Sequence, residues 1–410
     1  MNLMVIGLGK LGLPLAALLA EAGHKVTGYD SSFELIKKLQ SGMNSFIEPE
    51  LGEYLTKGKS NLVFTHSFKE VRGEIDIVFI IVPTPSLSTG HFSNENLILV
   101  LKDLGSSLST FQKDGKIVID IVSTVMPGTS VNELIPLIEK QTSMQIGDKI
   151  GFCYNPEFIA LGSVIHDMQY PDMHLIGASS EWAGMKVLDV LSSIVKKEVP
   201  ATQLSLTEAE IVKISVNNFV TMKISYANLL QQISDKIGGI DIDKVTSSIG
   251  LDSRIGTKYL KAAAPYGGPC FPRDTRAMSA LFKDFNLENY LSVATEKANS
   301  SHLDFLLNKI SSISPNGLIG VAGISYKRGT AVSEESPGLE LALALSHQGR
   351  DVVTWDEFGS FDSRIRRVEN ISDFVNEVDF IIITRAIDAE SRFFIASIMK
   401  PHLDLWRDRS

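Results

Sequence analysis

The feature that most constrains the fold of this chain is a glycine-rich hexapeptide, residues 7–12, close to the N-terminus. It follows an apolar run at residues 2–6, opens a helical pattern, and precedes a second strand-like run at residues 25–29. The first two glycines permit a tight turn and let backbone amides approach a pyrophosphate, and the last allows close packing of helix on strand. In a β-α-β unit this spacing predicts a dinucleotide-binding turn. We expect cofactor contacts at Gly7, Gly9, Leu11 and Gly12.

An acidic residue, Asp30, ends the second of these strand-like runs. A carboxylate at this position can accept hydrogen bonds from both ribose hydroxyls, and it repels a 2′-phosphate. The expected cofactor is therefore NAD rather than NADP. A glycine turn with a purely structural role is the alternative interpretation.

Strand-like and helix-compatible segments alternate through the rest of the N-terminal half. Apolar runs at residues 75–82, 117–122 and 174–176 are separated by stretches such as 94–108 and 131–140. This alternation predicts a parallel, doubly wound sheet.

The middle of the chain has a different pattern. Residues 205–237 contain neither proline nor glycine and carry apolar side chains at helical spacing, which predicts one long helix packed against other helices and against a second subunit. Residues 285–313 are also expected to be helical. Strand-helix alternation returns from residue 318, which predicts a second α/β domain. The expected fold class is α/β, with two Rossmann-like doubly wound domains joined by a central helical domain with one long helix.

Size and composition limit the possible functions. With 410 residues the chain exceeds one ordinary core, and we divide it into domains at residues 1–200, 201–300 and 301–410. A net charge of −9 disfavours nucleic acid as a partner. The N-terminus lacks the basic region of a signal peptide, and no apolar run is long enough to span a membrane. Two cysteines are too few for a disulfide framework, which favours the cytoplasm, and no metal site is expected.

One of the two cysteines, Cys270, lies in a loop rich in glycine and proline, residues 267–274. Thiolates are stabilised by nearby cations and by helix N-termini, and Arg273 or a helix beginning near Asp274 could supply such a field. A reactive thiol is one interpretation of this loop, and a buried structural cysteine is the other.

Taken together, several separated motifs give the chain a resemblance to the UDP-glucose/GDP-mannose dehydrogenase family over nearly its whole length. They are the glycine hexapeptide, Val82-Pro83-Thr84-Pro85, Ser123-Thr124-Val125, Asn155-Pro156-Glu157-Phe158, residues 210–217, Arg254-Ile255-Gly256 and the loop around Cys270. The resemblance implies NAD-dependent, four-electron oxidation of the C6 alcohol of a nucleotide sugar, with UDP-glucose to UDP-glucuronate as the default. Such enzymes serve polysaccharide biosynthesis among other pathways.

The resemblance also implies roles for individual residues. Cys270 would attack the C6 aldehyde to form a thiohemiacetal and then a thioester, which water cleaves. Lys213 and Asn217 would stabilise oxyanion character, Asp274 would act near the thiol and the water, and Glu157 and Thr124 would hold that water. Further cofactor contacts are expected at Pro83, Thr84 and Thr124. Substrate contacts are expected at Glu157, Phe158, Lys213, Asn217, Arg254, Tyr259, Lys261, Gly267 and Lys327, and the family implies a homodimer.

The sequence departs from the family pattern at four positions. Leu161 stands where many members carry a second glutamate, Val122 replaces a lysine, Glu334 replaces an arginine, and Arg273 replaces a lysine. These changes affect the substrate assignment more than the reaction type. Two alternatives stay open: a two-electron dehydrogenase acting on a hydroxy acid, and a non-catalytic homologue that binds nucleotides.

Overall fold

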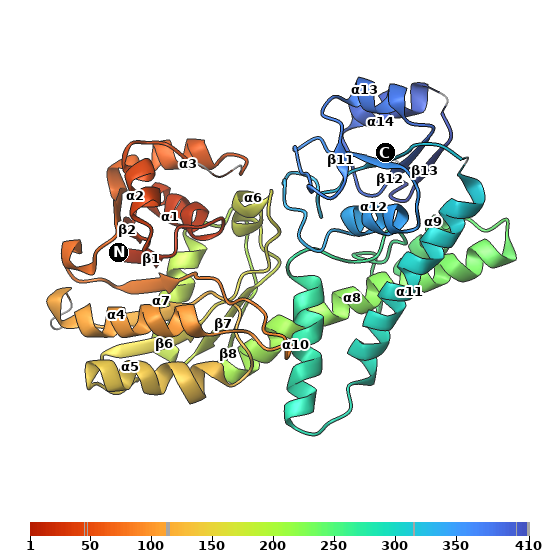
Figure 1. Ribbon diagram of the computed structural model, residues 1–410. Helices are drawn as coiled ribbons and strands as arrows, with labels where there is room; N and C mark the ends of the chain where they lie inside the picture. The colour runs from red at the N-terminus through yellow and green to blue at the C-terminus, as the bar shows by residue number, and fades with distance from the viewer. Residues whose placement is uncertain (45, 47, 112–114, 315, 399, 408–410) are drawn as a thin grey trace. The chain divides into compact units, whose positions relative to one another are not determined.

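The computed structural model describes residues 1–44, 46, 48–111, 115–314, 316–398 and 400–407. The chain divides into two compact units, Met1–Lys213 and Ile214–Ser410. Each unit contains its own β-sheet (Figure 1). The division into three domains at residues 200 and 300 stays a prediction.

The first unit is an eight-stranded sheet covered by helices. Its strands are β1 (Asn2–Ile6), β2 (Lys25–Tyr29), β3 (Leu62–Thr65), β4 (Ile77–Ile80), β5 (Ile117–Ile121), β6 (Ile150–Tyr154), β7 (His174–Ala178) and β8 (Ala201–Leu204). Its helices are α1 (Gly12–Glu21), α2 (Phe33–Gln40), α3 (Leu51–Lys57), η1 (Lys59–Asn61), η2 (Phe68–Glu70), α4 (Glu95–Phe111), η3 (Ser130–Leu134), α5 (Ile135–Thr142), α6 (Val164–Gln169) and α7 (Glu181–Ser192). The strand order is β3-β2-β1-β4-β5-β6-β7-β8.

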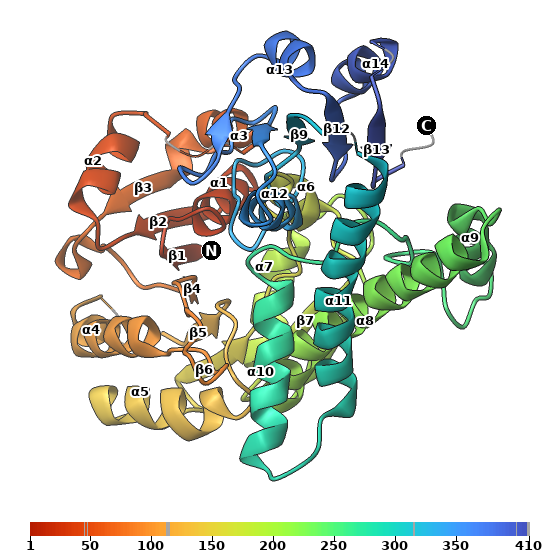
Figure 2. The same cartoon turned by 45° about the vertical axis from the view of Figure 1, so that its right-hand side comes forward.

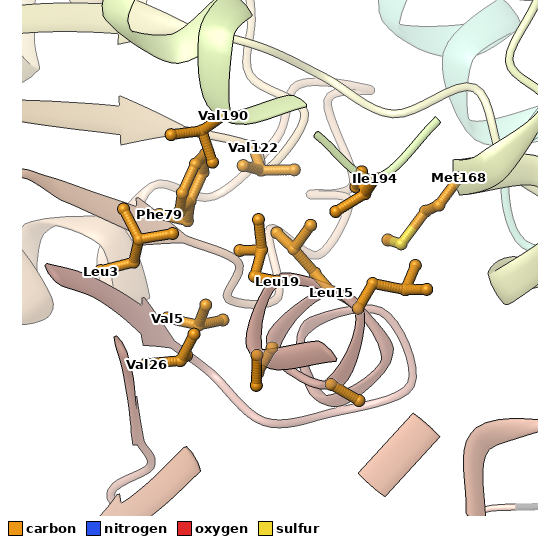
Figure 3. Close-up of a cluster of buried hydrophobic side chains, with 14 of the residues drawn as sticks. Leu3, Val5, Leu15, Leu19, Val26, Phe79, Val122, Met168, Val190 and Ile194 are labelled. Carbon is orange, nitrogen blue, oxygen red and sulfur yellow. The ribbon is translucent and has the colours of Figure 1, made fainter. Parts of the chain in front are cut away.

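Both faces of this sheet are buried, because successive residues of a strand point to opposite sides. In β1, Leu3 and Val5 belong to one core cluster, whereas Met4 and Ile6 belong to the other. Figure 3 shows part of the first cluster, in which Leu15 and Leu19 of α1 lie near the side chains of the strands. The helices α4 and α5 contribute to the second cluster. The sheet therefore has a layer of helices on each face.

One strand pair departs from the expected parallel arrangement. β6 and β7 are antiparallel, with Tyr154 opposite Gly177, and β8 is parallel to β7, so the last two strands run opposite to the first six. The connection between β6 and β7 contains only a short helix, α6, which packs against α1. The chain therefore does not cross back to the start of β6, and β7 begins near the end where β6 finishes.

The second unit combines helices with a smaller sheet. Most of α8 (Leu206–Ile237) lies in this unit, followed by α9 (Ile242–Gly250), α10 (Phe271–Asp284) and α11 (Tyr290–Ile313). The sheet region consists of β9 (Ile319–Ala322), α12 (Pro337–His347), β10 (Val352–Trp355), β11 (Arg366–Arg367), α13 (Ile371–Glu377), β12 (Phe380–Ile383), α14 (Ala389–Ser397) and β13 (His402–Asp404). Its parallel strands have the order β11-β10-β9-β12-β13.

The long helix expected at residues 205–237 is present as α8. α10 and α11 lie side by side (Figure 2). α11 begins five residues later than expected, because the side chain of Asn289 accepts a hydrogen bond from the backbone N–H of Ser292 and caps the helix there. No helix in the described part of the chain combines the length and apolarity needed to cross a membrane.

The second sheet repeats the strand order of the first five strands of the first sheet, and it also repeats their first turn. Gly323 follows β9 with φ +89°, and its N–H donates to the carbonyl of Trp355 at 2.9 Å. Gly7 follows β1 with φ +92° and donates to Tyr29 at 2.8 Å. The two α/β ends of the chain therefore share a local backbone design as well as a fold class.

Candidate active site

The glycine turn of the first unit requires glycine for steric reasons at two positions. A Cβ on Gly7 would lie 2.1 Å from the carbonyl oxygen of Ile81, which directly follows β4. A Cβ on Gly12 would lie 1.8 Å from the carbonyl oxygen of Gly7. The turn thus sits between the ends of β1 and β4, where the strand order reverses and where doubly wound sheets bind ligands.

Gly9 is different, because apart from its own atoms and its two chain neighbours no heavy atom of the described residues lies within 4 Å of the position that its Cβ would take. The residues of α1 are all described, and its first turn contains no acidic residue and no side-chain cap; Leu11 occupies the N-cap position. The N–H of Leu13 donates to the carbonyl of Gly9 at 3.2 Å and Pro14 has no N–H, so an anion above Gly9 would bind N–H groups of the turn that precede Leu13, at the positive end of the helix. This space suits a pyrophosphate.

The carboxylate of Asp30 is held beside the same turn. Its Oδ2 accepts from the N–H of Leu8 and its Oδ1 from the N–H of Ser32, each at 2.9 Å. A carboxylate oxygen can accept more than one hydrogen bond, so Asp30 can still receive ribose hydroxyls. Asp30, the helix N-terminus and the space above Gly9 together fit NAD.

The loops that follow β4 and β5 are tied to each other. Ser123 Oγ accepts from the N–H of Val82 at 2.8 Å, and Thr84 Oγ1 donates to the carbonyl of Thr124 at 2.7 Å. Asn96 supports the first loop by donating to the carbonyl of Pro83 at 2.8 Å. The structure therefore brings together Pro83, Thr84 and Thr124, at the same edge of the sheet as the glycine turn.

A buried glutamate links the loop after β5 to α8. Glu210 accepts from the N–H of Gly128 at 2.6 Å and from that of Ser130 at 2.9 Å. The motif around residues 210–217 contains Glu210, but the sequence did not reveal this capping role. Because Lys213 lies one helical turn further along α8, Glu210 fixes the loop of Thr124 relative to Lys213.

Lys213 contacts the turn that follows β6. Its Nζ donates to the backbone carbonyl of Glu157 at 2.6 Å and lies 4.5 Å from the ring centroid of Phe158. Lys213 is only 6% exposed, which is unusual for a lysine. The first unit thus groups Glu157, Phe158 and Lys213, three residues that the sequence assigns to the site.

The carboxyl group of Glu157 lies in an environment that favours its neutral form. Burial raises the pKa of Glu157 to about 7, and the nearby Lys213 ammonium opposes this shift only in part. Behind it, Asp120 of β5 is completely buried, with Asn155 Nδ2 at 3.4 Å from its Oδ2, and burial raises the pKa of Asp120 well above its usual range. A carboxyl group with a pKa near neutrality can both give and take a proton at physiological pH.

In the second unit, Asp274 connects α10 to α8. This carboxylate is fully buried and accepts from Asn217 Nδ2 at 2.6 Å and from Arg273 Nε at 3.2 Å. Asn218 donates to the backbone carbonyl of Asp274 at 3.0 Å. The expected partners Asn217 and Asp274 are therefore in direct contact, and Arg273 contributes a cation three residues after Cys270 in the sequence.

Cys270 occupies the N-cap position of α10, and it is exposed, whereas Cys153 is buried. The expected helix after the cysteine is present and begins at Phe271, three residues earlier than Asp274. Tyr259 approaches this point, with its ring 6.2 Å from that of Phe271. A thiol at a helix N-terminus and open to solvent has the environment of a reactive cysteine.

The remaining candidate residues are distributed more widely within the second unit. Arg254 pairs with Asp252, with Nη2 2.6 Å from Oδ2, on an exposed turn after α9. Lys261 lies 4.7 Å from the ring centroid of Trp406. Lys327 follows Tyr326, whose ring packs on Gly268, and Gly267 touches the backbone of Glu335. Gly267 and Lys327 therefore lie near the Cys270 loop, whereas Arg254 is engaged with Asp252.

Two of the four departures from the family pattern are apolar and lie in the core. Val122 is buried in the first core cluster and is labelled in Figure 3, and Leu161 packs against the same cluster. Arg273 pairs with Asp274, and Glu334 is exposed. The two apolar replacements thus make packing contacts in place of polar ones.

Two family models match most of the chain. The NAD binding domain of the UDP-glucose/GDP-mannose dehydrogenase family matches residues 1–196, and the central domain of that family matches residues 207–301. The resemblance inferred from the motifs is confirmed by these matches.

Individual relatives agree with the family models. UDP-glucose 6-dehydrogenase AglM of Haloferax volcanii is 32% identical over 373 residues, covering 89% of this chain and 85% of that protein. GDP-mannose 6-dehydrogenase of Pseudomonas savastanoi pv. phaseolicola is 29% identical over 404 residues, covering 93% and 90%. The solved UDP-glucose dehydrogenase of Pyrobaculum islandicum matches with a TM-score of 0.88 at 29% identity, covering 99% of this chain and 94% of that one. These matches confirm the expected fold class.

The two glycines Gly9 and Gly12 should separate cofactor binding from folding. Gly9→Ala adds a Cβ into open space, so the free energy of unfolding in urea should stay unchanged, while the affinity for NAD in calorimetric titration should fall at least about tenfold. Gly12→Ala places a Cβ against a carbonyl and should destabilise the chain by about 1–3 kcal/mol. Wild-type NAD affinity in the Gly9→Ala variant would contradict the assignment.

The pKa of Glu157 predicts a dependence of stability on pH. Because its folded pKa of about 7 lies above its ordinary value of 4.5, the unfolded chain loses this proton first, and stability falls as the pH rises from 4.5 to 7. Glu157→Gln removes this loss. Its free energy of unfolding should exceed that of the wild type by on the order of 3 kcal/mol at pH 8, and the difference should shrink towards pH 4.5.

The control for this measurement is Glu208→Gln. Hydrogen bonds from Ser205 lower the pKa of Glu208, so its neutral replacement should destabilise the chain at pH 8, opposite in sign to Glu157→Gln. A Glu157→Gln variant that is no more stable than wild type at pH 8 would argue against a buried carboxyl with a raised pKa.

Proposed function

Because this chain belongs to the UDP-glucose/GDP-mannose dehydrogenase family, we propose that it oxidises the C6 alcohol of a nucleotide sugar to a carboxylate with NAD as the oxidant. UDP-glucose is the first substrate to consider, since relatives named for UDP-glucose and for GDP-mannose both match the chain. The observation that carries the proposal is Cys270, an exposed thiol at the N-terminus of α10 beside the buried Asp274.

The thiol accounts for the four-electron stoichiometry. NAD held at the glycine turn and Asp30 would supply the oxidant for two hydride losses from C6, the first giving an aldehyde and the second converting the thiohemiacetal to a thioester. Cys270 Sγ then adds to the aldehyde carbon, a C–S bond forms, and the carbonyl oxygen takes up a proton to give a thiohemiacetal. This covalent bond retains the aldehyde until its carbon has reached the oxidation level of an acid.

Release of the acid requires water. Water attacks the thioester carbon, the C–S bond breaks, and Cys270 leaves as a thiolate that the helix N-terminus and Arg273 stabilise. Glu157, with its pKa near neutrality, takes a proton from this water, Thr124 helps to hold the water, and Asp274 takes part near the thiol. Lys213 and Asn217 stabilise the negative charge that develops on the C6 oxygen.

Binding of the two ligands is divided along the chain. Gly7, Gly9, Leu11, Gly12 and Asp30 would hold NAD, and Pro83, Thr84 and Thr124 would make further contacts with it. Phe158, Arg254, Tyr259, Lys261, Gly267 and Lys327 contact the sugar nucleotide, whose diphosphate needs cations on an otherwise acidic chain. In this assignment residues 1–200 bind NAD, residues 201–300 carry the lysine and the thiol, and residues 301–410 bind the nucleotide.

The protein is proposed to be a homodimer in the cytoplasm. Apolar side chains at heptad-like spacing are exposed along α8, among them Phe219, Tyr226, Ile233 and Ile237. Such a stripe is costly in water and suits a second copy of the same helix. Cys153 and Cys270 are not joined in a disulfide, which is consistent with a reducing compartment.

Two alternative functions differ from the proposed one in whether they need a reactive thiol and whether they produce NADH. A two-electron dehydrogenase of hydroxy acids needs no thiol, and a non-catalytic homologue binds NAD and nucleotide sugars without producing NADH. The exposed Cys270 favours the four-electron reaction over both, because a structural cysteine is usually buried.

The stoichiometry of NADH tests the reaction. With purified protein and a panel led by UDP-glucose and GDP-mannose, two NADH should form per sugar nucleotide consumed. Cys270→Ser should reduce formation of the acid by at least about a thousandfold, with wild-type unfolding in urea, because serine is a much weaker nucleophile at neutral pH.

Cys153→Ser is the control for this test, because its thiol lies in the core rather than at a helix terminus. It should lower stability but leave the ratio of NADH to substrate at two. One NADH per substrate would favour the two-electron enzyme, and binding of nucleotide sugars without NADH would favour the non-catalytic homologue.

The proposed dimer interface is tested by charge. Replacing Tyr226 and Ile233 together by glutamate places charges on the exposed apolar stripe and should convert a dimer into a monomer in light scattering coupled to gel filtration. Glutamate at Phe393 of α14, which is more exposed than Tyr226 and Ile233, serves as the control and should leave the mass unchanged. A wild-type chain that is monomeric at micromolar concentration would refute the proposed interface.

A further inference from the structure

One residue of the second unit contacts the chain on both sides of Cys270. Before the thiol, the N–H of Gly268 donates to the backbone carbonyl of Glu335 at 2.8 Å. After the thiol, Arg276 of α10 forms a two-pronged ion pair with the carboxylate of Glu335, with N–O distances of 2.6 and 3.2 Å. Glu335 therefore holds the loop that leads into Cys270 and the helix that leads out of it.

The local backbone is adapted to this contact. A Cβ on Gly267 would lie 2.2 Å from the carbonyl oxygen of Glu335, so the loop can approach only because residue 267 is glycine. Glu335 itself has φ +45°, in the left-handed region that non-glycine residues avoid. Such a strained backbone conformation persists only where the surrounding structure enforces it.

We infer that Glu335 is a positioning residue for Cys270, which fixes the thiol at the N-terminus of α10 through its backbone carbonyl on one side and its ion pair with Arg276 on the other. The inference rests on the proposed function in taking Cys270 as the nucleophile. Glu335 itself makes no bond to the reacting atoms. It acts by setting the geometry from which the sulfur attacks.

An effect of Glu335 through its charge and an effect through the position of Cys270 predict opposite changes in the rate at which the thiol is alkylated, so the rate separates the two effects. If Glu335 acted only through its charge, its neutral replacement would leave Arg276 unpaired, and a nearby unpaired cation would favour the thiolate and speed its alkylation. If Glu335 positions the thiol, the same replacement loosens Cys270 from the helix terminus and slows alkylation. Better access cannot mask this loss, because Cys270 is already exposed.

The experiment measures the rate of Cys270 alkylation by iodoacetamide at pH 7.5, from the mass of the intact chain. Because the other cysteine, Cys153, is buried, one adduct reports on Cys270. Glu335→Gln should slow alkylation at least about threefold and lower kcat about tenfold, with little change in the KM for the sugar nucleotide. The charge-swapped double variant Arg276→Glu/Glu335→Arg should recover part of both losses.

The matched control is Asp235→Asn, which breaks an ion pair of similar length and exposure between α8 and α11, Lys309 Nζ to Asp235 Oδ2 at 2.6 Å. It should change neither rate. An unchanged or faster alkylation in folded Glu335→Gln protein would overturn the inference. The alkylation assay needs no substrate, so it still tests Glu335 if no sugar nucleotide is oxidised, an outcome that would instead refute the proposed function.

Discussion

The close contact between a helix and the carbonyl at the end of a strand is the constraint on which the rest of this structure depends. In the first unit, α1 approaches so closely that a Cβ on Gly12 would lie 1.8 Å from the carbonyl oxygen of Gly7. This contact places the N-terminus of the helix at the turn, beside the open space at Gly9. It also brings the turn next to Asp30, whose carboxylate binds the N–H of Leu8. The shape of the cofactor site therefore depends first on how the backbone of the helix packs on the strand end, and only then on the surrounding side chains.

The second unit contains the same close contact between a helix and a strand end, but the acidic residue beside it has a different partner. A Cβ on Gly338 would lie 2.4 Å from the carbonyl oxygen of Gly323, and Asp356 accepts from the N–H groups of Ser325 and Phe358 much as Asp30 does in its own turn. Here, however, the buried guanidinium of Arg385 donates to Asp356 at 2.9 Å. The carboxylate that would receive a ribose is thus already neutralised, and this copy of the turn is not equipped like the NAD site of the first unit.

The features that could be predicted from the sequence are those that depend on a local pattern of residues. The glycine spacing, the terminal Asp30 and the uninterrupted stretch at residues 205–237 each depend on neighbours in sequence, and the fold they predict is the observed one. The antiparallel β7 was missed because strand direction depends on where α6 packs. Glu210 and Glu335 were missed as positioning groups because their partners lie far away in sequence, and the positive φ of Glu335 has no signature in a glutamate.

Burying ionisable groups at the site lowers the free energy of unfolding, and hydrogen bonds in the surrounding loops offset part of this loss. The first unit buries Asp120 and Lys213 and partly buries Glu157, and removing ionisable groups from water in this way costs free energy. The surrounding contacts offset this cost. Glu210 satisfies two backbone N–H groups of the loop after β5, and the amides and hydroxyls of the neighbouring loops bond to one another. The fold therefore keeps the buried Lys213 close to Glu157, whose pKa is about 7, at a cost in stability. Ionisable groups with shifted pKa values in such costly surroundings are typical of sites of proton transfer.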